Sequence, residues 1–176
     1  MVQELMGSLT KTAHILSTII IGLRMGGNNS YNKSLRGVPK VDRTHNDTGQ
    51  RVAGHKVLVQ KKSPFQVQVP MNSNSDSPIY LCARNIKGKD GKFEIASIGI
   101  YENHKIVGQI DLVLDKNGNV KPYTSDGKGT HYHIFKESDG GRIGRNSGEK
   151  ANHLPIPSKY QSLLDKVIEY NKNQRL

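Results

Sequence analysis

The chain has 176 residues, enough for one domain of ordinary size that buries a core without disulfides. Hydrophobic residues make up only 34% of it, so we expect a small sheet with long loops. The formal net charge of +11 favours a polyanionic partner, because Lys and Arg gain affinity by releasing counterions from phosphates. The single cysteine excludes a disulfide framework and a zinc site made of thiolates.

Residues 1–25 are predicted to form an amphipathic helix. Ile15, Ile19 and Leu23 recur at helical spacing, and the Gly26-Gly27 pair would end the helix. The apolar run is shorter than the ~20 residues that a bilayer-spanning helix needs, so we expect no membrane span. An acidic residue before the run and the lack of a small-x-small cleavage site after it disfavour a signal peptide.

Residues 26–54 are predicted to be a long loop or linker, since they are rich in Gly, Asn, Ser, Lys and Arg and show little periodicity. Basic side chains gather in and around this segment. Between residues 24 and 62, nine Lys and Arg residues face only two acidic ones, Asp42 and Asp47. Arg43 and Arg51 of this basic arm are therefore candidates for binding a phosphate-bearing substrate.

Residues 55–176 are predicted to form an α+β domain. Its last helix follows a Ser-x-x-Gln capping box at residues 158–161 and carries apolar residues at helical spacing. The chain as a whole is expected to be α+β, with an N-terminal helix, an antiparallel sheet of about five strands and a C-terminal helix. The expected strands are 56–60, 65–69, 79–83, 93–101, 105–114 and 130–135, with a hairpin turn at 102–104.

The strand-like segment 130–135 carries two histidines, His131 and His133, at positions i and i+2. Side chains alternate along a strand, so both imidazoles point to the same side. Such a pair can act as general acid and base near neutral pH, ligate a metal ion, or lie on a polar sheet surface.

The basic groups that follow this strand favour general acid and base catalysis by the two histidines. Metal-independent cleavage of RNA needs one group to deprotonate the 2′-hydroxyl, one to protonate the leaving oxygen and a cation to stabilise the phosphate. This chemistry needs no cofactor and no metal. The predicted catalytic residues are His131, His133, Arg145 and His153, and the predicted substrate-binding residues are Arg142, Lys128, Tyr123, Arg43 and Arg51.

Three alternatives remain open from the sequence. A metal-dependent DNA nickase would use the His-x-His pair, a nucleophilic Tyr160 or Tyr170 on the last helix, and Asp111 as an acidic ligand. A zinc site would use the pair together with His153, leaving a coordination position open. A non-catalytic protein of phage or mobile-element origin would bind nucleic acid or an acidic protein, and its histidines would be incidental.

The segments Gln109-Ile110-Asp111-Leu112, Gly129-Thr130-His131-Tyr132-His133-Ile134-Phe135, Arg142-Ile143-Gly144-Arg145 and Pro155-Ile156-Pro157 loosely resemble parts of the C-terminal effector modules of polymorphic toxins and phage-associated proteins. Those modules commonly have the barnase, EndoU, colicin and RelE type of fold, in which a helix packs on an antiparallel sheet that cleaves RNA without metal. The resemblance implies a toxin-type nuclease, most simply an endoribonuclease, with His131, His133, Arg142 and Arg145 as candidate site residues. Its substrate would be RNA, with single-stranded DNA as the alternative. The sequence does not fix its location: a nuclease toxin would act in the cytoplasm, and secretion by a carrier is an open alternative. The resemblance also implies an acidic immunity protein as a partner.

Overall fold

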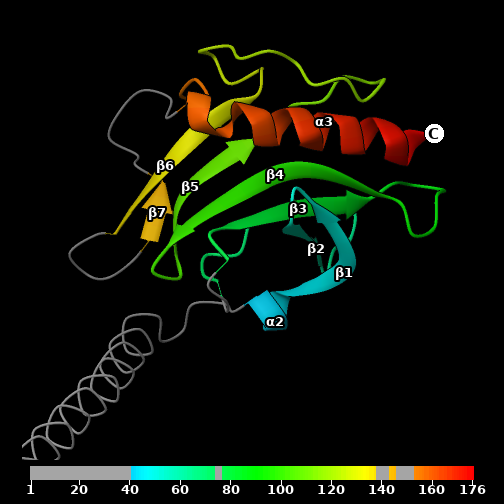
Figure 1. Ribbon diagram of the computed structural model, residues 1–176, viewed down its shortest axis with the longest axis horizontal. Helices are drawn as coiled ribbons and strands as arrows, with labels where there is room; N and C mark the ends of the chain where they lie inside the picture. The colour runs from blue at the N-terminus through cyan, green and yellow to red at the C-terminus, as the bar shows by residue number, and fades with distance from the viewer. Residues whose placement is uncertain (1–40, 74–76, 138–142, 146–152) are drawn as a thin grey trace, which may run out of the picture. The chain divides into compact units, whose positions relative to one another are not determined.

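The computed structural model describes residues 41–73, 77–137, 143–145 and 153–176, which belong to one compact unit, Val38–Leu176. In these residues a seven-stranded sheet carries one long helix, α3, across one of its faces (Figure 1). No helix in the described part of the chain is long and apolar enough to cross a membrane.

The strands are hydrogen-bonded in sequence order, from β1 at one edge to β7 at the other. β2 and β3 run parallel, and every other neighbouring pair of described strands is antiparallel. A 3-10 turn, η1, leads into α3. The bounds are α2 Val41–Thr44, β1 His45–Val52, β2 His55–Gln60, β3 Ile79–Asn85, β4 Phe93–Glu102, β5 Lys105–Asp111, β6 His131–Glu137, β7 Ile143–Arg145, η1 Ser158–Tyr160 and α3 Gln161–Arg175.

The expected antiparallel sheet of about five strands is wrong, because the sheet is mixed and has seven strands. Residues 45–52, which were expected to belong to a loop, form the edge strand β1. An edge strand is held by backbone hydrogen bonds to one neighbour, so it needs no alternating hydrophobic pattern. Residues 65–69, expected as a strand, lie instead in the crossover that the parallel pair β2 and β3 requires. The predicted helix at 1–25 lies outside the described residues.

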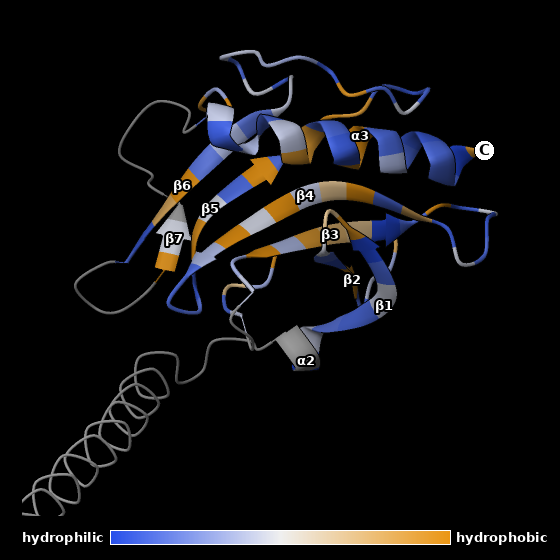
Figure 2. Cartoon of the chain, in the orientation of Figure 1, coloured by the Kyte–Doolittle hydropathy of each residue, from blue (hydrophilic) through white to orange (hydrophobic). Residues whose placement is uncertain are grey.

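The main core lies between α3 and the sheet. Leu81, Ile98 and Ile110 are directly paired across β3, β4 and β5, so they share the face that α3 covers. Leu164 and Val167 of α3 complete this core, and Figure 2 shows the hydrophobic positions along these three strands. The amphipathic spacing read from the sequence accounts for this packing.

The expected capping box at the start of the last helix is absent. Ser158 begins the 3-10 turn η1, and no side chain caps either η1 or α3. The Tyr160 N–H donates to Pro157 O at 2.9 Å, so a backbone hydrogen bond takes the place of a side-chain cap.

The opposite face of the sheet carries a second, smaller core that includes Tyr80, Tyr101 and Val69. Gly99 lies in the middle of this face, and a Cβ there would come within 2.5 Å of Val69 and 2.7 Å of the Tyr101 hydroxyl. The missing side chain therefore lets the crossover segment approach the sheet. Next to this core, where Ser97, Asp111 and His131 are paired across β4, β5 and β6, the same face becomes polar.

The protein is expected to become less stable as the pH is lowered, because of His45. Burial lowers the pKa of this histidine, although its hydrogen bond to a backbone carbonyl opposes the shift. Its Nε2–H donates to Gln68 O at 2.6 Å, and its Nδ1 accepts from the Thr44 hydroxyl at 2.7 Å. The unfolded chain takes up a proton at a pKa of about 6.5, above the folded value, so the contribution of His45 is fully present above that pH and decreases below it. Between about pH 7 and pH 5, the free energy of unfolding measured by urea titration should decrease less for His45→Gln than for the natural protein. Identical pH profiles for the variant and the natural protein would contradict this.

Candidate functional site

Strand pairing brings a group of polar side chains together on the sheet face opposite α3. Ser97 is paired with Asp111, and Asp111 with His131, while Gln109 is paired with His133 in the adjacent row. Directly paired residues on neighbouring strands point to the same face, so β4, β5 and β6 each contribute to one site.

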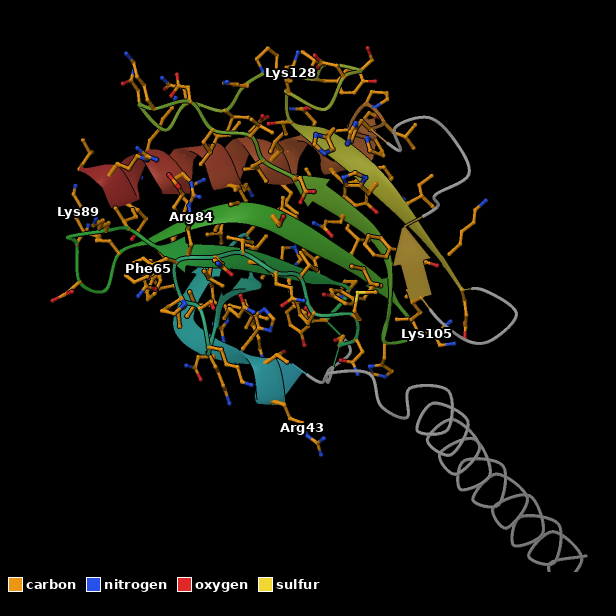
Figure 3. All side chains as sticks on the ribbon, turned by 180° about the vertical axis from the view of Figure 1, so that it is seen from behind. Arg43, Phe65, Arg84, Lys89, Lys105 and Lys128 are labelled. Atoms are coloured by element: carbon orange, nitrogen blue, oxygen red, sulfur yellow. The ribbon has the colours of Figure 1, made fainter. Side chains whose placement is uncertain are left out.

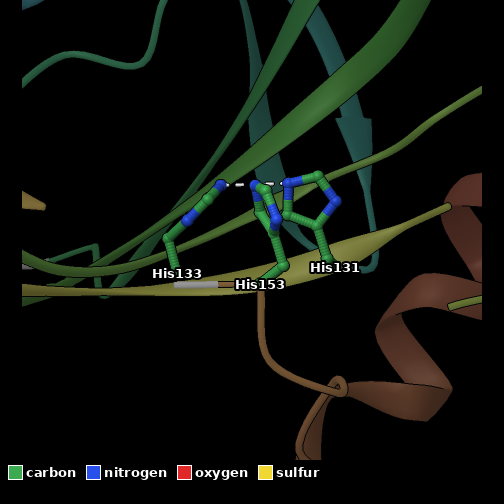
Figure 4. A group of neighbouring side chains, drawn as sticks. All are labelled: His131, His133 and His153. Carbon is green, nitrogen blue, oxygen red and sulfur yellow. Dashed lines mark hydrogen bonds between the residues drawn. The ribbon is translucent and has the colours of Figure 1, made fainter. Parts of the chain in front are cut away.

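Three histidine rings meet at this site (Figure 4). His131 Nε2 lies 3.0 Å from His133 Nε2, and the ring of His153 stacks edge-on with its centroid 4.3 Å from that of His131 and 5.2 Å from that of His133. His131 and His133 are 6% and 2% exposed, whereas His153 is only partly buried. The two rings point to the same side of β6, as the alternation of side chains predicts.

The tautomer of His131 follows from its hydrogen bond to the backbone. Its Nδ1 lies 2.6 Å from Gly129 O, and a carbonyl oxygen can only accept, so the proton of Nδ1 is held there. In the neutral ring Nε2 then carries a lone pair, and this lone pair faces His133.

Asp111 is held beside the histidines by two neighbours. Its Oδ1 accepts hydrogen bonds from the Ser97 hydroxyl and the Gln109 side-chain amide. Its Oδ2 lies 3.3 Å from His133 Nε2 and 3.9 Å from His131 Nε2. The carboxylate is therefore oriented with one oxygen towards the sheet and the other towards the imidazoles.

His153 reaches the site because the chain returns to β6. Leu154 forms a two-way backbone bridge with Tyr132, with hydrogen bonds of 2.8 and 2.9 Å, and the Tyr123 hydroxyl donates to His153 O at 3.0 Å. Gly127 has a φ of +75°, and a Cβ at this position would lie 2.4 Å from the His153 ring. A glycine is thus required where the loop before β6 packs against His153.

The other predicted residues near β6 have different surroundings. Arg145 pairs through its backbone with Phe135, and its side chain lies outside the described part of the structure, as does all of Arg142. Lys128 is exposed and forms an ion pair with Asp126 at 2.9 Å.

Arg43 and Arg51, the predicted substrate-binding residues of the basic arm, lie away from the histidines. They belong to α2 and β1, and four strands separate β1 from β6. Figure 3 shows Arg43 and Lys128 on opposite sides of the unit Val38–Leu176. Arg51 forms an ion pair with Asp47 at 2.8 Å. A single substrate-binding site cannot include all the basic residues that the sequence suggested.

Ser97 and Gln109 are site residues that the sequence analysis missed, and Asp111 was considered only as a ligand for the nickase alternative. The signal was present in β5, where polar Gln109 and Asp111 alternate with buried Ile110 and Leu112. Alternation of this kind places two polar side chains on the face opposite the main core. Cys82 lies in the same row, but burial raises the pKa of its thiol well above its usual range, and Asp111 adds to the shift, so it is a poor nucleophile.

No protein-family model matches the chain, and no curated protein and no solved structure shows significant similarity to it. Its function must therefore be argued from the chemistry of the site. A partly exposed imidazole backed by two buried imidazoles and a carboxylate can transfer protons or bind a metal ion.

A pocket of about 420 Å³ lies between the loop before β6, residues 155–156 and α3, so it belongs to the α3 side of the sheet and not to the face that carries the histidines. Tyr123 and Pro155 line it. The Tyr123 hydroxyl donates to His153 O, and Pro155 follows His153 by two residues. The Tyr123 side chain is 40% exposed, so part of its ring is accessible to a ligand.

Proposed function

We propose that the protein cleaves nucleic acid, as an endoribonuclease, at the site formed by His131, His133, His153 and Asp111. The observation that carries the proposal is the meeting of three imidazoles and one carboxylate on a chain with a net charge of +11. Imidazoles can remove the proton of an RNA 2′-hydroxyl and return a proton to the leaving oxygen. The charge favours binding of a polyanion.

The spacing of the rings assigns them different tasks. His131 and His133 are in hydrogen-bond contact, so a phosphate cannot lie between them as they stand. His153 is the most exposed of the three and is the ring best placed to meet the substrate. His131, His133 and Asp111 then orient it and tune its environment from behind.

The accessible ring of Tyr123, whose hydroxyl donates to His153 O, supports a nucleotide substrate. A pocket of about 420 Å³ with an accessible Tyr123 ring can hold a nucleobase, because aromatic rings stack on any base.

The toxin-type role expected from the resemblance belongs to the same proposal. An effector with a net charge of +11 would be neutralised by an acidic immunity protein, since complementary charge speeds and specifies association. We therefore expect the binding partner to be acidic and to compete with RNA for the protein.

The proposal is tested by incubating the purified full-length protein with an RNA and with a single-stranded DNA of the same sequence. RNA should be cut and leave 2′,3′-cyclic phosphate ends, because attack by the 2′-hydroxyl produces them, and DNA should stay intact. Binding of RNA without cleavage, in buffers with and without added divalent metal, would overturn the enzyme and favour a binding protein. Nicking of DNA would overturn the ribonuclease and favour the nickase alternative.

A further inference from the structure

We infer that His131, His133, His153 and Asp111 form a binding site for one divalent transition-metal ion of the zinc type. The inference concerns the same site as the proposed function and deepens it. It departs from the metal-free chemistry expected from the sequence, and it stands on the geometry of the four donor groups.

The distances between the donor atoms are close to those of a tetrahedral metal site or somewhat longer. With bonds of about 2.0–2.1 Å, the ligand atoms of a tetrahedral zinc site lie about 3.3–3.4 Å apart. The distance from His131 Nε2 to His133 Nε2 is 3.0 Å, and Asp111 Oδ2 lies 3.3 and 3.9 Å from these two nitrogens. A ring nitrogen of His153 lies within 4.8 Å of both of the other imidazole ligand atoms.

The surroundings of the donor atoms resemble those of metal ligands. A ligating histidine usually donates its second ring N–H to a carbonyl or a carboxylate, as His131 does to Gly129 O. A ligating carboxylate is usually hydrogen-bonded in turn, as Asp111 Oδ1 is by Ser97 and Gln109. These contacts direct His131 Nε2 and Asp111 Oδ2 towards the centre of the cluster.

The third histidine completes the donor set. His153 brings a third imidazole to the cluster, with one ring nitrogen within 4.8 Å of the ligand atoms of His131 and His133.

The donor set also indicates the class of metal. Three imidazoles and one carboxylate suit zinc and neighbouring transition metals, whereas magnesium and calcium prefer oxygen ligands. A site with these four ligands would be closed if all of them bind, and displacement of one would open a position for substrate.

The test measures metal binding directly. Full-length protein is stripped of metal with a chelator, and Zn²⁺ is added in a calorimeter, with Co²⁺ as a spectroscopic probe. We expect one ion per chain, the intense visible absorption of four-coordinate Co²⁺ and a higher melting temperature with metal. His133→Ala should lower the affinity at least about 100-fold, and Ser97→Ala, which keeps every ligand, about 10-fold or more.

Gly127→Ala is a variant that keeps all four ligand residues but changes the position of one of them. The added Cβ would displace the His153 ring, so we expect weaker zinc binding and a weaker visible Co²⁺ spectrum. His55→Ala, which removes an imidazole on β2 at the far side of the sheet, is the control and should bind as tightly as the natural protein. Circular dichroism of each variant establishes that it is folded.

The outcomes separate this inference from the proposed function. Absence of stoichiometric binding, or equal affinity in folded His133→Ala and His55→Ala, would overturn the metal site. RNA cleavage by the metal-free protein in the presence of EDTA would leave the proposed function intact and remove any role of the metal in it. Binding of one ion without cleavage of RNA would support the metal site and overturn the proposed function.

Discussion

Replacing His131 by alanine is expected to lower the rate of RNA cleavage by about 100-fold or more. His131 joins the other groups of the site, since its Nε2 faces His133 and its ring stacks with His153. Its loss would therefore disturb the orientation of the His153 ring that meets the substrate, and it would equally remove one ligand if a metal ion carries the chemistry. Initial rates with a defined RNA substrate measure the effect.

The variant His131→Ala removes a buried ring, so its fold must be compared with that of the natural protein. His55→Ala is a matched control, because this histidine begins β2, and three strands separate β2 from β6. It should cleave RNA at the natural rate. A folded His131→Ala protein that is as active as His55→Ala would place the reaction at another site.

Replacing Asn171 by alanine is expected to lower the free energy of unfolding by about 2–4 kcal/mol. Asn171 is 1% exposed on α3, and its side chain makes two hydrogen bonds to the backbone of Ile95 in β4. Its Oδ1 accepts from the Ile95 N–H and its Nδ2 donates to the Ile95 O, both at 2.8 Å. Alanine would leave both buried backbone groups without partners, and each such loss costs about 1–3 kcal/mol.

The position of Ile95 in β4 explains why its backbone groups bond to a helix side chain and not to another strand. β5 ends at Asp111, which is paired with Ser97, so Ile95 lies beyond the last residue of β4 that β5 covers. The side-chain amide of Asn171 supplies one donor and one acceptor, as the next residue of a strand would. Asn171 therefore fixes the position of α3 along the sheet, and it also supplies hydrogen-bond partners for the N–H and C=O groups of Ile95.

Asn173→Ala is the control for this prediction, since it changes the same residue type at an exposed position of the same helix. Alanine favours helix over asparagine, so Asn173→Ala should be neutral or slightly stabilising. Urea denaturation of the two variants gives the comparison. Similar unfolding free energies for the two would show that the Asn171 hydrogen bonds add little to stability.

Several parts of the fold follow from local patterns in the sequence. The hairpin of β4 and β5 and the strand β6 have turn residues and hydrophobic residues at short range, and the amphipathic spacing of α3 identifies the face that packs on the sheet. β1 escaped detection because an exposed edge strand needs backbone partners and no hydrophobic stripe. The parallel pairing of β2 with β3 depends on the path of the crossover between them, and the residues of the two strands do not predict that path.

That His131 and His133 share one side of a strand follows from the sequence, because side chains alternate with a period of two. The groups that these rings contact depend on how the chain folds. The pairing register places Asp111 opposite His131, and the backbone bridge between Tyr132 and Leu154 brings His153 to the same site. The register and the bridge both depend on backbone hydrogen bonds between segments far apart in the chain. Every residue type except proline offers the same backbone N–H and C=O groups, so the sequence does not show which segments will pair. The same contacts separate this site from Arg43 and Arg51, which net charge alone had grouped with it.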